Sequence, residues 1–301
     1  MNVNALIIGC GNIGSQYDLK NNLVQTHSKA MFISNWINNV DLYDLDTTIP
    51  IKISKLYGFN VLNEYSKDCL NKYDIVSICT PTNTHYKFLK DCILKNVKVV
   101  ICEKPISFST EELNELLLLY NSGNTKVLVN YYRRFQNSYR SLKQIINPFK
   151  DDLCSAKINY YKGLLNYASH AFDTIHFILG NPLMIEGLSV QSLDYDYFKD
   201  DPTMSANFKS SEVQYYLVGE NTTNPILNID LIFKNYRILI NKLGNTAFVY
   251  HNDILIHTFD NMIKNYMIDV LNHAKSLFLN NTQNDNFKES LVLNKQLINI
   301  I

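Results

Sequence analysis

A lysine stands directly after an apolar segment in the stretch VVICEKP. Val99 to Cys102 have the composition of a buried strand, and Glu103, Lys104 and Pro105 follow them without a linker. In a parallel sheet the carboxyl ends of the strands form the edge where ligands bind. An ammonium group at this edge can donate a hydrogen bond to a hydroxyl or carbonyl oxygen, and the proline would fix the backbone that aims it. A surface salt bridge is the structural alternative for the lysine.

A glycine motif with phosphate-binding spacing lies near the N-terminus. In IIGCGNIG the three glycines Gly9, Gly11 and Gly14 have the GxGxxG spacing, with Asn12 and Ile13 between the last two. The motif follows an expected strand and opens an expected helix, as dinucleotide binding requires. The glycines would allow a tight turn, close approach to a pyrophosphate and close helix packing. All five residues are therefore predicted to bind the cofactor, and a tight turn without a ligand is the alternative.

An acidic residue after the second expected strand is the candidate for reading the adenosine ribose. Asp44 is followed by Leu45 and Asp46 rather than by a cation. Its carboxylate would accept hydrogen bonds from the ribose hydroxyls and would repel a 2′-phosphate, which favours NAD over NADP. The interval from Gly14 exceeds the usual spacing of about 20 residues. The polar segment 15–25 accounts for the excess, and we expect it to interrupt the first helix as a loop near the cofactor. The structural alternative for Asp44 is a turn residue at the strand end.

Polar side chains also follow the third expected strand, in the stretch CTPTNTHY. Thr80, Pro81, Asn83 and His85 stand at the ligand edge of the sheet, and we expect them to contact the cofactor. Glu103 is expected either to hold the ammonium of its neighbour or to contact the nicotinamide ribose. The structural alternative for this stretch is helix capping by Asn83 or Thr84.

The elements that must position these side chains form two domains. Near-continuous apolar strands alternate with helices in residues 1–130, which predicts a Rossmann-type, doubly wound parallel sheet of the α/β class. The expected strands cover residues 4–8, 40–44, 74–79, 98–102 and 126–130, and the expected helices cover residues 26–36, 83–95 and 110–120. Thr26 is the expected N-cap of the first helix.

In residues 131–301 strands follow one another without helices between them. This pattern predicts an α+β domain with a large, mainly antiparallel open sheet. Its strands are expected at residues 154–161, 188–195, 212–218, 226–233, 236–241 and 247–250, and its helices at 138–146, 168–179, 265–279 and 287–300. We expect the free face of this sheet to pair with another subunit in a homo-oligomer. Candidates for its two faces are Leu188, Val190, Val213, Ile229 and Leu231.

Composition excludes several other classes of protein. The 301 residues carry 28 basic and 28 acidic side chains, so there is no net charge to attract nucleic acid or an anionic membrane. No apolar run reaches the roughly 20 residues of a membrane span, and the N-terminus lacks the features of a signal peptide. The six cysteines form no CxxC pair. We expect a cytoplasmic protein with reduced thiols and no metal site.

Several motifs together resemble the glucose–fructose oxidoreductase/inositol dehydrogenase (Gfo/Idh/MocA) family. They are GCGNIG, CTPTNTH, CEKP, NYYRRF and GLLNYASHAFD, which occur in this order along essentially the whole chain. The resemblance implies that Lys104 is catalytic and contacts both cofactor and substrate. It also implies an NAD-dependent oxidoreductase that converts a secondary hydroxyl to a ketone on a sugar, sugar phosphate or nucleotide-linked sugar. The chain's size and motif are similar to those of members found with surface-polysaccharide biosynthesis.

The second catalytic element that the resemblance implies begins at Gly163. His170 would take the hydroxyl proton, because imidazole titrates near neutral pH. Asp173, one helical turn later, would steady the helix or the imidazole and lie at the substrate. Where many members carry Asp, this chain has Asn166, which has no acid–base function but can bind a sugar hydroxyl. Arg133 and Arg134 are likewise expected near the substrate, as ligands of phosphate or carboxylate, unless one of them bridges the domains. A core histidine is the alternative for His170.

Two other functions remain open at this point. One is a non-catalytic NAD-binding sensor or assembly module, which would need neither Lys104 nor His170. The other is a family member that uses hydride transfer transiently, for epimerisation or glycoside cleavage.

Overall fold

The computed structural model describes residues 2–280 and 284–301. The chain forms two compact units, the first from Met1–Tyr132 with Asn265–Leu291 and the second from Arg133–Lys264 with Val292–Ile301. Residues 265–280 and 284–291 therefore pack with the first unit, although the sequence analysis placed them in the second domain.

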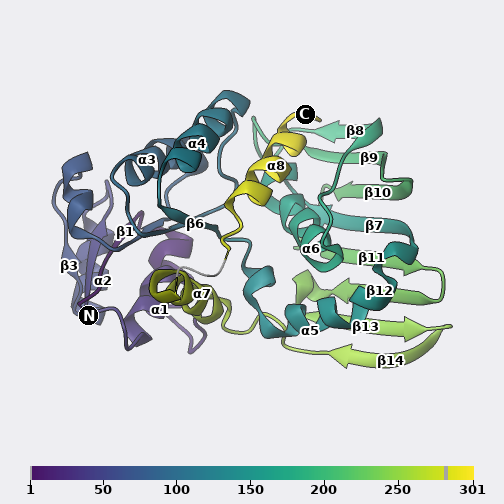
Figure 1. Cartoon of the computed structure of the whole chain (residues 1–301), viewed down its shortest axis with the longest axis horizontal. Helices are drawn as coiled ribbons and strands as arrows, with labels where there is room; N and C mark the ends of the chain where they lie inside the picture. The colour runs from purple at the N-terminus through teal and green to yellow at the C-terminus, as the bar shows by residue number, and fades with distance from the viewer. Residues whose placement is uncertain (1, 281–283) are drawn as a thin grey trace. The chain divides into compact units, whose positions relative to one another are not determined.

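A six-stranded parallel sheet forms the centre of the first unit (Figure 1). Its strand order is β3-β2-β1-β4-β5-β6, which reverses direction at β1 and confirms the predicted doubly wound sheet. All residues of β4 and β5 are buried, as expected for strands covered on both faces. The strands are β1 Asn4–Ile8, β2 Asn39–Tyr43, β3 Asn60–Val61, β4 Ile75–Ile78, β5 Val99–Cys102 and β6 Lys126–Val129.

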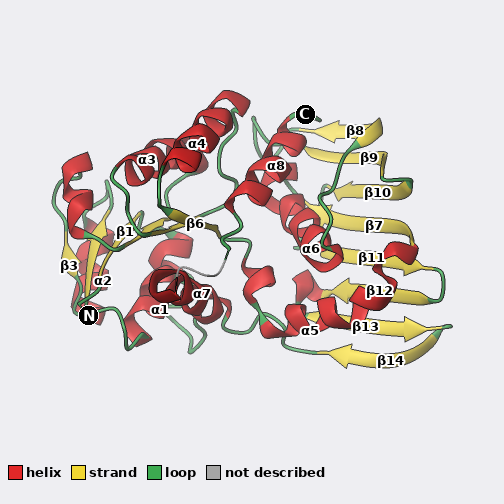
Figure 2. Ribbon diagram, viewed as in Figure 1, coloured by secondary structure: helices red, strands yellow, loops and turns green. Residues whose placement is uncertain are grey.

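Helices cover both faces of this sheet. Figure 2 shows α3 and α4 together on one side, with α1 and α7 on the other. Two of the helices begin at side-chain caps: Thr26 accepts a hydrogen bond from the N–H of Lys29, and Ser109 accepts one from the N–H of Glu112. The helices are α1 His27–Ile33, α2 Thr48–Tyr57, α3 Thr82–Leu94, α4 Thr110–Ser122 and α7 Tyr266–Asn280, with a 3-10 turn at Lys67–Lys72.

The first unit differs from the sequence expectation in three elements. Helix α1 ends at Ile33 rather than at residue 36, because Ser34 already has an extended backbone. Helix α2 and the short strand β3 were not expected. Helix α2 carries Pro50 in its first turn, where no backbone N–H is needed, and ends at Gly58 in the left-handed conformation.

The polar segment 15–25 is an ordered loop that closes on a buried carboxylate. The glycine motif opens only a short π-helical turn, Asn12–Gln16, and not helix α1 itself. The side chain of Asp18 then accepts hydrogen bonds from the N–H groups of Gln25 and Thr26, at 2.6 and 2.8 Å, and from the hydroxyl of Thr26. These bonds return the chain to the start of α1, so the insertion leaves the sheet intact.

The second unit is built on an eight-stranded open sheet with the order β14-β13-β12-β11-β7-β10-β9-β8. Only β10 and β7 pair in parallel, which confirms the predicted mainly antiparallel sheet. The sequence analysis missed β9 and β14. The strands are β7 Leu153–Tyr161, β8 Glu186–Asp194, β9 Thr203–Ser210, β10 Val213–Glu220, β11 Leu227–Phe233, β12 Tyr236–Asn241, β13 Thr246–His251 and β14 Ile254–Phe259.

One face of this sheet is buried within the unit, under α5 (Asn137–Ile146) and α6 (Ser169–Leu179) (Figure 1). A row of paired residues that crosses five strands on this face is at most 2% exposed: Leu217, Ile158, Ile229, Ile240 and Ala247. The neighbouring row of paired residues lies on the opposite face and is at least partly exposed to solvent: Tyr216, Lys157, Asp230, Leu239 and Phe248. Ile229 and Leu231 therefore belong to the core of the unit and are excluded as candidates for an intersubunit face.

Helix α8, Phe287–Ile298, closes the chain. Among the described residues, none of the helices combines the length and the apolar composition that crossing a membrane requires.

Candidate active site

The glycine loop has the shape that a pyrophosphate requires. Gly9 has φ of +92°, and a Cβ there would lie 2.7 Å from the backbone of Cys79. A Cβ at Gly14 would lie 2.2 Å from the carbonyl oxygen of Gly9. At Gly11, by contrast, a Cβ would meet no atom within 4 Å. Two glycines are thus required by packing, while the third keeps the backbone open to a ligand, as dinucleotide binding needs. The residues present fit the expected cofactor.

Asp44 lies immediately after β2 and is bonded to the glycine loop. Its Oδ2 accepts a hydrogen bond of 2.6 Å from the N–H of Cys10, and its Oδ1 accepts one from the N–H of Asp46. Burial, and secondarily the charge of Asp44, raise the pKa of Cys10 to about 12, so this thiol stays neutral. Asp44 therefore couples the end of β2 to the phosphate loop. Its contact with the ribose remains a prediction.

The loop after β4 presents Pro81 and Asn83 to solvent. Neither Asn83 nor Thr84 caps helix α3; the N-cap is Pro81, which has no side-chain cap bond. The hydroxyl of Thr84 instead donates within the loop, to Thr80 and to the carbonyl of Pro81. Cofactor contact by Thr80, Pro81 and Asn83 stays a prediction.

His85 has a different role from the one predicted. Its ring is 1% exposed, with Nδ1 2.8 Å from the carbonyl oxygen of Pro105 and Nε2 2.7 Å from that of Thr80. Both ring nitrogens are thus occupied by backbone, so neither is available to a cofactor. The histidine instead ties the segment after Lys104 to the loop after β4.

Glu103 also turns inward. It is 8% exposed and accepts hydrogen bonds from Nε2 of His27, at 3.0 Å, and from the side-chain amide of Asn130. Burial opposes the charge on Glu103, but these hydrogen bonds and the charge of Lys104 outweigh it and lower the pKa of the carboxyl. A buried, ionised Glu103 therefore supports the strand end, and its contact with the nicotinamide ribose stays a prediction.

His27 and Asn130 were not singled out from the sequence. Asn130 follows β6 as Glu103 follows β5, and the two strands are neighbours in the sheet. Because Asn130 and Glu103 end neighbouring strands at the same edge of the sheet, the sequence could have marked Asn130 as a partner of Glu103. No sequence feature marked His27, which reaches Glu103 from the start of α1.

Lys104 is held by its neighbours on both sides. Glu103 is fixed by His27 and Asn130, and the carbonyl of Pro105 is fixed by His85. The Lys104–Pro105 peptide bond is cis. Lys104 itself is half-buried, between two buried residues. The backbone on both sides of Lys104 is therefore fixed at the strand end, and the catalytic role of its ammonium group stays a prediction.

In the second unit, His170 is the second residue of α6. A π-helical turn, Leu164–Ala168, precedes this helix and runs into it without a break. The carbonyl of His170 accepts the hydroxyl of Thr174 at 2.7 Å, and its half-buried ring lies 6.4 Å from that of Tyr167. Asn166 lies in the π-helical turn and donates its side-chain amide to Asp201, a residue that the sequence analysis did not consider.

Three residues predicted to contact substrate are instead bonded to protein. Arg134 and Asp173 form a buried bidentate pair, with Nη2 2.6 Å from Oδ1 and Nε 3.2 Å from Oδ2. Arg133 is buried and donates to the carbonyl of Leu243. These contacts join the segment after β6 to α6 and to the β12–β13 connection, and contact of the three residues with a substrate stays a prediction.

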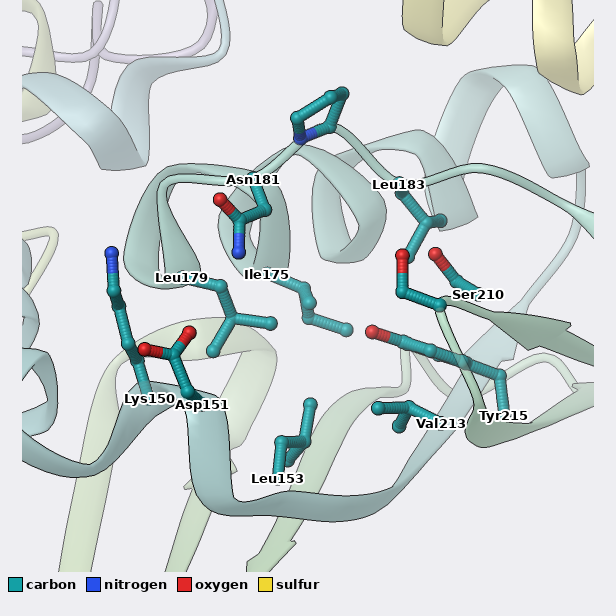
Figure 3. Close-up of a pocket in the computed structure, with 12 residues that line it drawn as sticks. Lys150, Asp151, Leu153, Ile175, Leu179, Asn181, Leu183, Ser210, Val213 and Tyr215 are labelled. Carbon is teal, nitrogen blue, oxygen red and sulfur yellow. The ribbon is translucent and has the colours of Figure 1, made fainter.

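Figure 3 shows a pocket of about 140 Å³ in the second unit. Its lining includes Ile175 and Leu179 in the C-terminal half of α6, whereas His170 lies at the start of that helix. Leu153, Ile175 and Val213 form part of its apolar wall, and Lys150 and Asp151 are among its polar residues. None of the predicted site residues lines it, so we do not assign the chemistry to this pocket.

Replacing His85 by Gln is expected to change how stability depends on pH. Burial lowers the pKa of His85, although its two carbonyl contacts oppose the shift. A folded-state pKa below the unfolded value means that stability is lost as pH falls below about 6.5. The stability advantage of the wild type over His85→Gln should therefore shrink on acidification, by up to about 1.4 kcal/mol per pH unit. Urea unfolding of both proteins between pH 8 and pH 5 measures this difference in the free energy of unfolding.

The matched control is His257→Gln, because His257 is exposed on β14. Its unfolding curves should follow the wild type at every pH. A constant difference between wild type and His85→Gln from pH 8 to pH 5 would contradict the assignment.

Comparison with known proteins agrees with this geometry. Residues 3–131 match the Gfo/Idh/MocA model, which describes an oxidoreductase family with an NAD-binding Rossmann fold. Inositol 2-dehydrogenase of Rhizobium meliloti is 24% identical over 210 residues, which are 64% of this chain and 60% of that protein. The match thus spans less than two thirds of the relative's length.

Two solved structures share the fold of both units. A dehydrogenase from Clostridium difficile has a TM-score of 0.79 at 17% identity and covers 100% of this chain and 98% of its own. A UDP-N-acetylglucosamine 3-dehydrogenase from Acidithiobacillus ferrooxidans has a TM-score of 0.80 at 13% identity, with 100% and 97% covered. Residues 3–131 of this chain are therefore similar to the NAD-binding Rossmann domain of the Gfo/Idh/MocA oxidoreductase family, and the whole chain shares the fold of solved dehydrogenases.

Proposed function

We propose that this chain is an NAD-dependent oxidoreductase that interconverts a secondary hydroxyl and a ketone on a sugar, sugar phosphate or nucleotide-linked sugar. The observation that carries the proposal is the fixation of Lys104 at the carboxyl edge of the sheet, where Glu103 and Pro105 are both locked by buried side chains. Relatives that act on inositol and on a nucleotide-linked sugar support the substrate class.

In the proposed reaction the chain's own residues handle the oxygen and its proton. Lys104 donates a hydrogen bond to the reacting oxygen and stabilises negative charge as it develops. His170 takes the hydroxyl proton during oxidation and returns it during reduction. Hydride chemistry at the carbon would be supplied by a bound nicotinamide cofactor. Both side chains must reach one substrate for this chemistry, which substitution tests.

Lys104→Ala and His170→Ala are each expected to lower turnover by about 10²–10⁴-fold, since each removes a positioned group that acts on the reacting oxygen. The affinity for NAD should change by less than about threefold, because neither residue belongs to the phosphate loop. Tritium transfer from labelled NADH to a panel of keto-sugars measures turnover, and calorimetric titration measures affinity.

Lys98→Ala and His257→Ala are the matched controls. Lys98 precedes the same strand at its other end and pairs with Asp74, and His257 is an exposed residue of β14. Both should keep wild-type transfer. Wild-type transfer in the Lys104 and His170 variants would overturn the catalytic assignment. NAD binding without transfer to any sugar would favour a non-catalytic binding module.

We expect NAD to bind at least about tenfold more tightly than NADP, a difference of about 1.4 kcal/mol. Asp44, tied to the glycine loop through Cys10, would place its charge against a 2′-phosphate, and the exposed Asp46 adds a second carboxylate. Titration with both cofactors tests this preference, and Asp44→Asn should narrow it. Equal or tighter binding of NADP would show that Asp44 does not read the ribose.

We also propose that the exposed face of the eight-stranded sheet joins subunits in a homo-oligomer. Tyr216 and Ile232 project from this face and are 43% and 42% exposed, so pairing would remove apolar area from water. Light scattering at micromolar concentration should show more than one chain per particle, and Ile232→Asp should lower that number. A monomeric wild type would contradict the proposal.

A further inference from the structure

Asp201 is a buried carboxylate that bonds to the turn before α6. It is 1% exposed and lies just before β9. Its Oδ1 accepts the N–H of Leu165 at 2.7 Å, and its Oδ2 accepts the N–H of Asn166 at 2.8 Å. The same Oδ2 accepts the side-chain amide of Asn166 at 2.7 Å. One carboxylate thus receives three N–H donors from two consecutive residues.

The residues around Asp201 complete this arrangement. The N–H of Gly163 donates to the hydroxyl of Thr203, and the N–H of Leu164 donates to the carbonyl of Pro202. Four consecutive N–H groups, those of residues 163–166, are therefore satisfied by residues 201–203. The first N–H groups of a helix lack partners within the helix, and negative charge is favourable beside them. The segment 201–203 acts as a cap supplied from a distant part of the chain.

Gly163 is required by the same carboxylate. Its φ is +82°, and a Cβ at this position would lie 2.5 Å from Oδ2 of Asp201. The glycine that begins the motif therefore leaves room for Asp201 rather than for a ligand.

We infer that Asp201 is a positioning residue that holds the π-helical turn, and through it His170 on α6, and that position 166 must carry an amide because it faces this carboxylate. The part that concerns His170 rests on the proposed function, whereas the pairing of Asp201 with Asn166 does not. The inference accounts for an amide at position 166 by the carboxylate that faces it.

An aspartate at position 166 would bring two carboxylates into contact. Its oxygen would replace an amide that lies 2.7 Å from Oδ2, inside a buried site. Two carboxylates at this distance cannot both ionise without a large penalty, so one would hold a proton well above its normal pH range. A raised pKa means that stability is retained at acid pH and lost as pH rises.

Other titratable groups lie around this site. They are Tyr160 and Tyr161 on β7, Lys162 before the turn, Tyr167 within it, His170 on α6 and Asp200 beside Asp201. Burial, and secondarily the charge of Asp201, raise the pKa of Tyr160, so this phenol stays neutral. Because an imidazole ordinarily titrates near neutral pH, each variant must be compared with the wild type at the same pH.

The test compares Asn166→Asp, Asn166→Ala and Asp201→Asn with the exchanged double variant Asn166→Asp/Asp201→Asn, by thermal unfolding between pH 5 and pH 8. Asn166→Asp should melt about 5–10 °C below the wild type at pH 8, and the difference should shrink toward pH 5. Asn166→Ala adds no charge, so its loss should not depend on pH. The double variant should recover at least about half of the loss at pH 8, because an amide again faces a carboxylate.

Asn221→Asp is the matched control. Asn221 donates its side-chain amide to Asp194 at 2.6 Å, an exposed contact in the same part of the chain. This substitution should shift melting by less than about 2 °C. If Asn166→Asp were as stable as the wild type at pH 8, or if the double variant lost the sum of the single losses, the pairing would be wrong.

A second readout tests the link to His170. Asn166→Asp at pH 8 should lower tritium transfer by about 10- to 100-fold without changing the affinity for NAD, and the double variant should regain most of it. Unchanged transfer in a destabilised Asn166→Asp would reject the positioning role. If the wild type transferred tritium to no sugar, the proposed function would fail, while the imidazole pKa of His170, followed by NMR in wild type and Asn166→Asp, would still decide the link.

Discussion

In each unit of this protein, a buried carboxylate requires hydrogen-bond donors, and the contacts that supply them fix the surrounding backbone. Taking an ionised carboxylate out of water is costly unless hydrogen bonds replace its hydration. In the first unit, Glu103 obtains these bonds from His27 and Asn130, which draws the start of α1 and the end of β6 onto the end of β5. In the second unit, Asp201 obtains them from the backbone of the turn before α6. Each carboxylate thereby fixes the backbone next to a half-buried, polar side chain.

Burial separates the charged and polar residues of these motifs into two groups. Glu103, His85, Arg133, Arg134 and Asp173 are all buried and bonded within the protein. By contrast, Lys104, His170 and Asn83 are at least partly exposed to solvent, and they lie at or next to the ends of helices and strands. A group that acts on a ligand must be reachable, whereas a group that holds a backbone gains strength from exclusion of water. The first group therefore supports the second, even though both stand in the same motifs.

Much of the fold was predictable from the chain because local patterns specify it. Apolar strands such as residues 75–78 and 99–102 are buried on both faces, which requires helices on both sides and hence a doubly wound sheet. Strand β9 was missed although Met204, Ala206 and Phe208 alternate with polar residues along it. Strand β14 carries no such signal, because five of its six residues are exposed. The sequence analysis also missed helix α2, although the sequence contains Pro50 near its start and Gly58 at its end, which are typical helix boundary signals. The glycine motif and Lys104 were found from spacing, since their neighbours along the chain suffice to place them.

The supporting contacts could not be predicted, because they join residues that are distant in sequence. Arg134 pairs with Asp173 across 39 positions, His27 with Glu103 across 76, and Asn166 with Asp201 across 35. A charged residue within a motif looks the same whether its partner is a substrate or another part of the chain. What distinguishes the two is whether the fold brings a complementary group within hydrogen-bond distance. Position 166 is an example: its amide is the hydrogen-bonding complement of the buried carboxylate of Asp201. In the proposed reaction, proton transfer therefore falls to His170, and Asp201 holds the turn that precedes its helix without itself exchanging a proton.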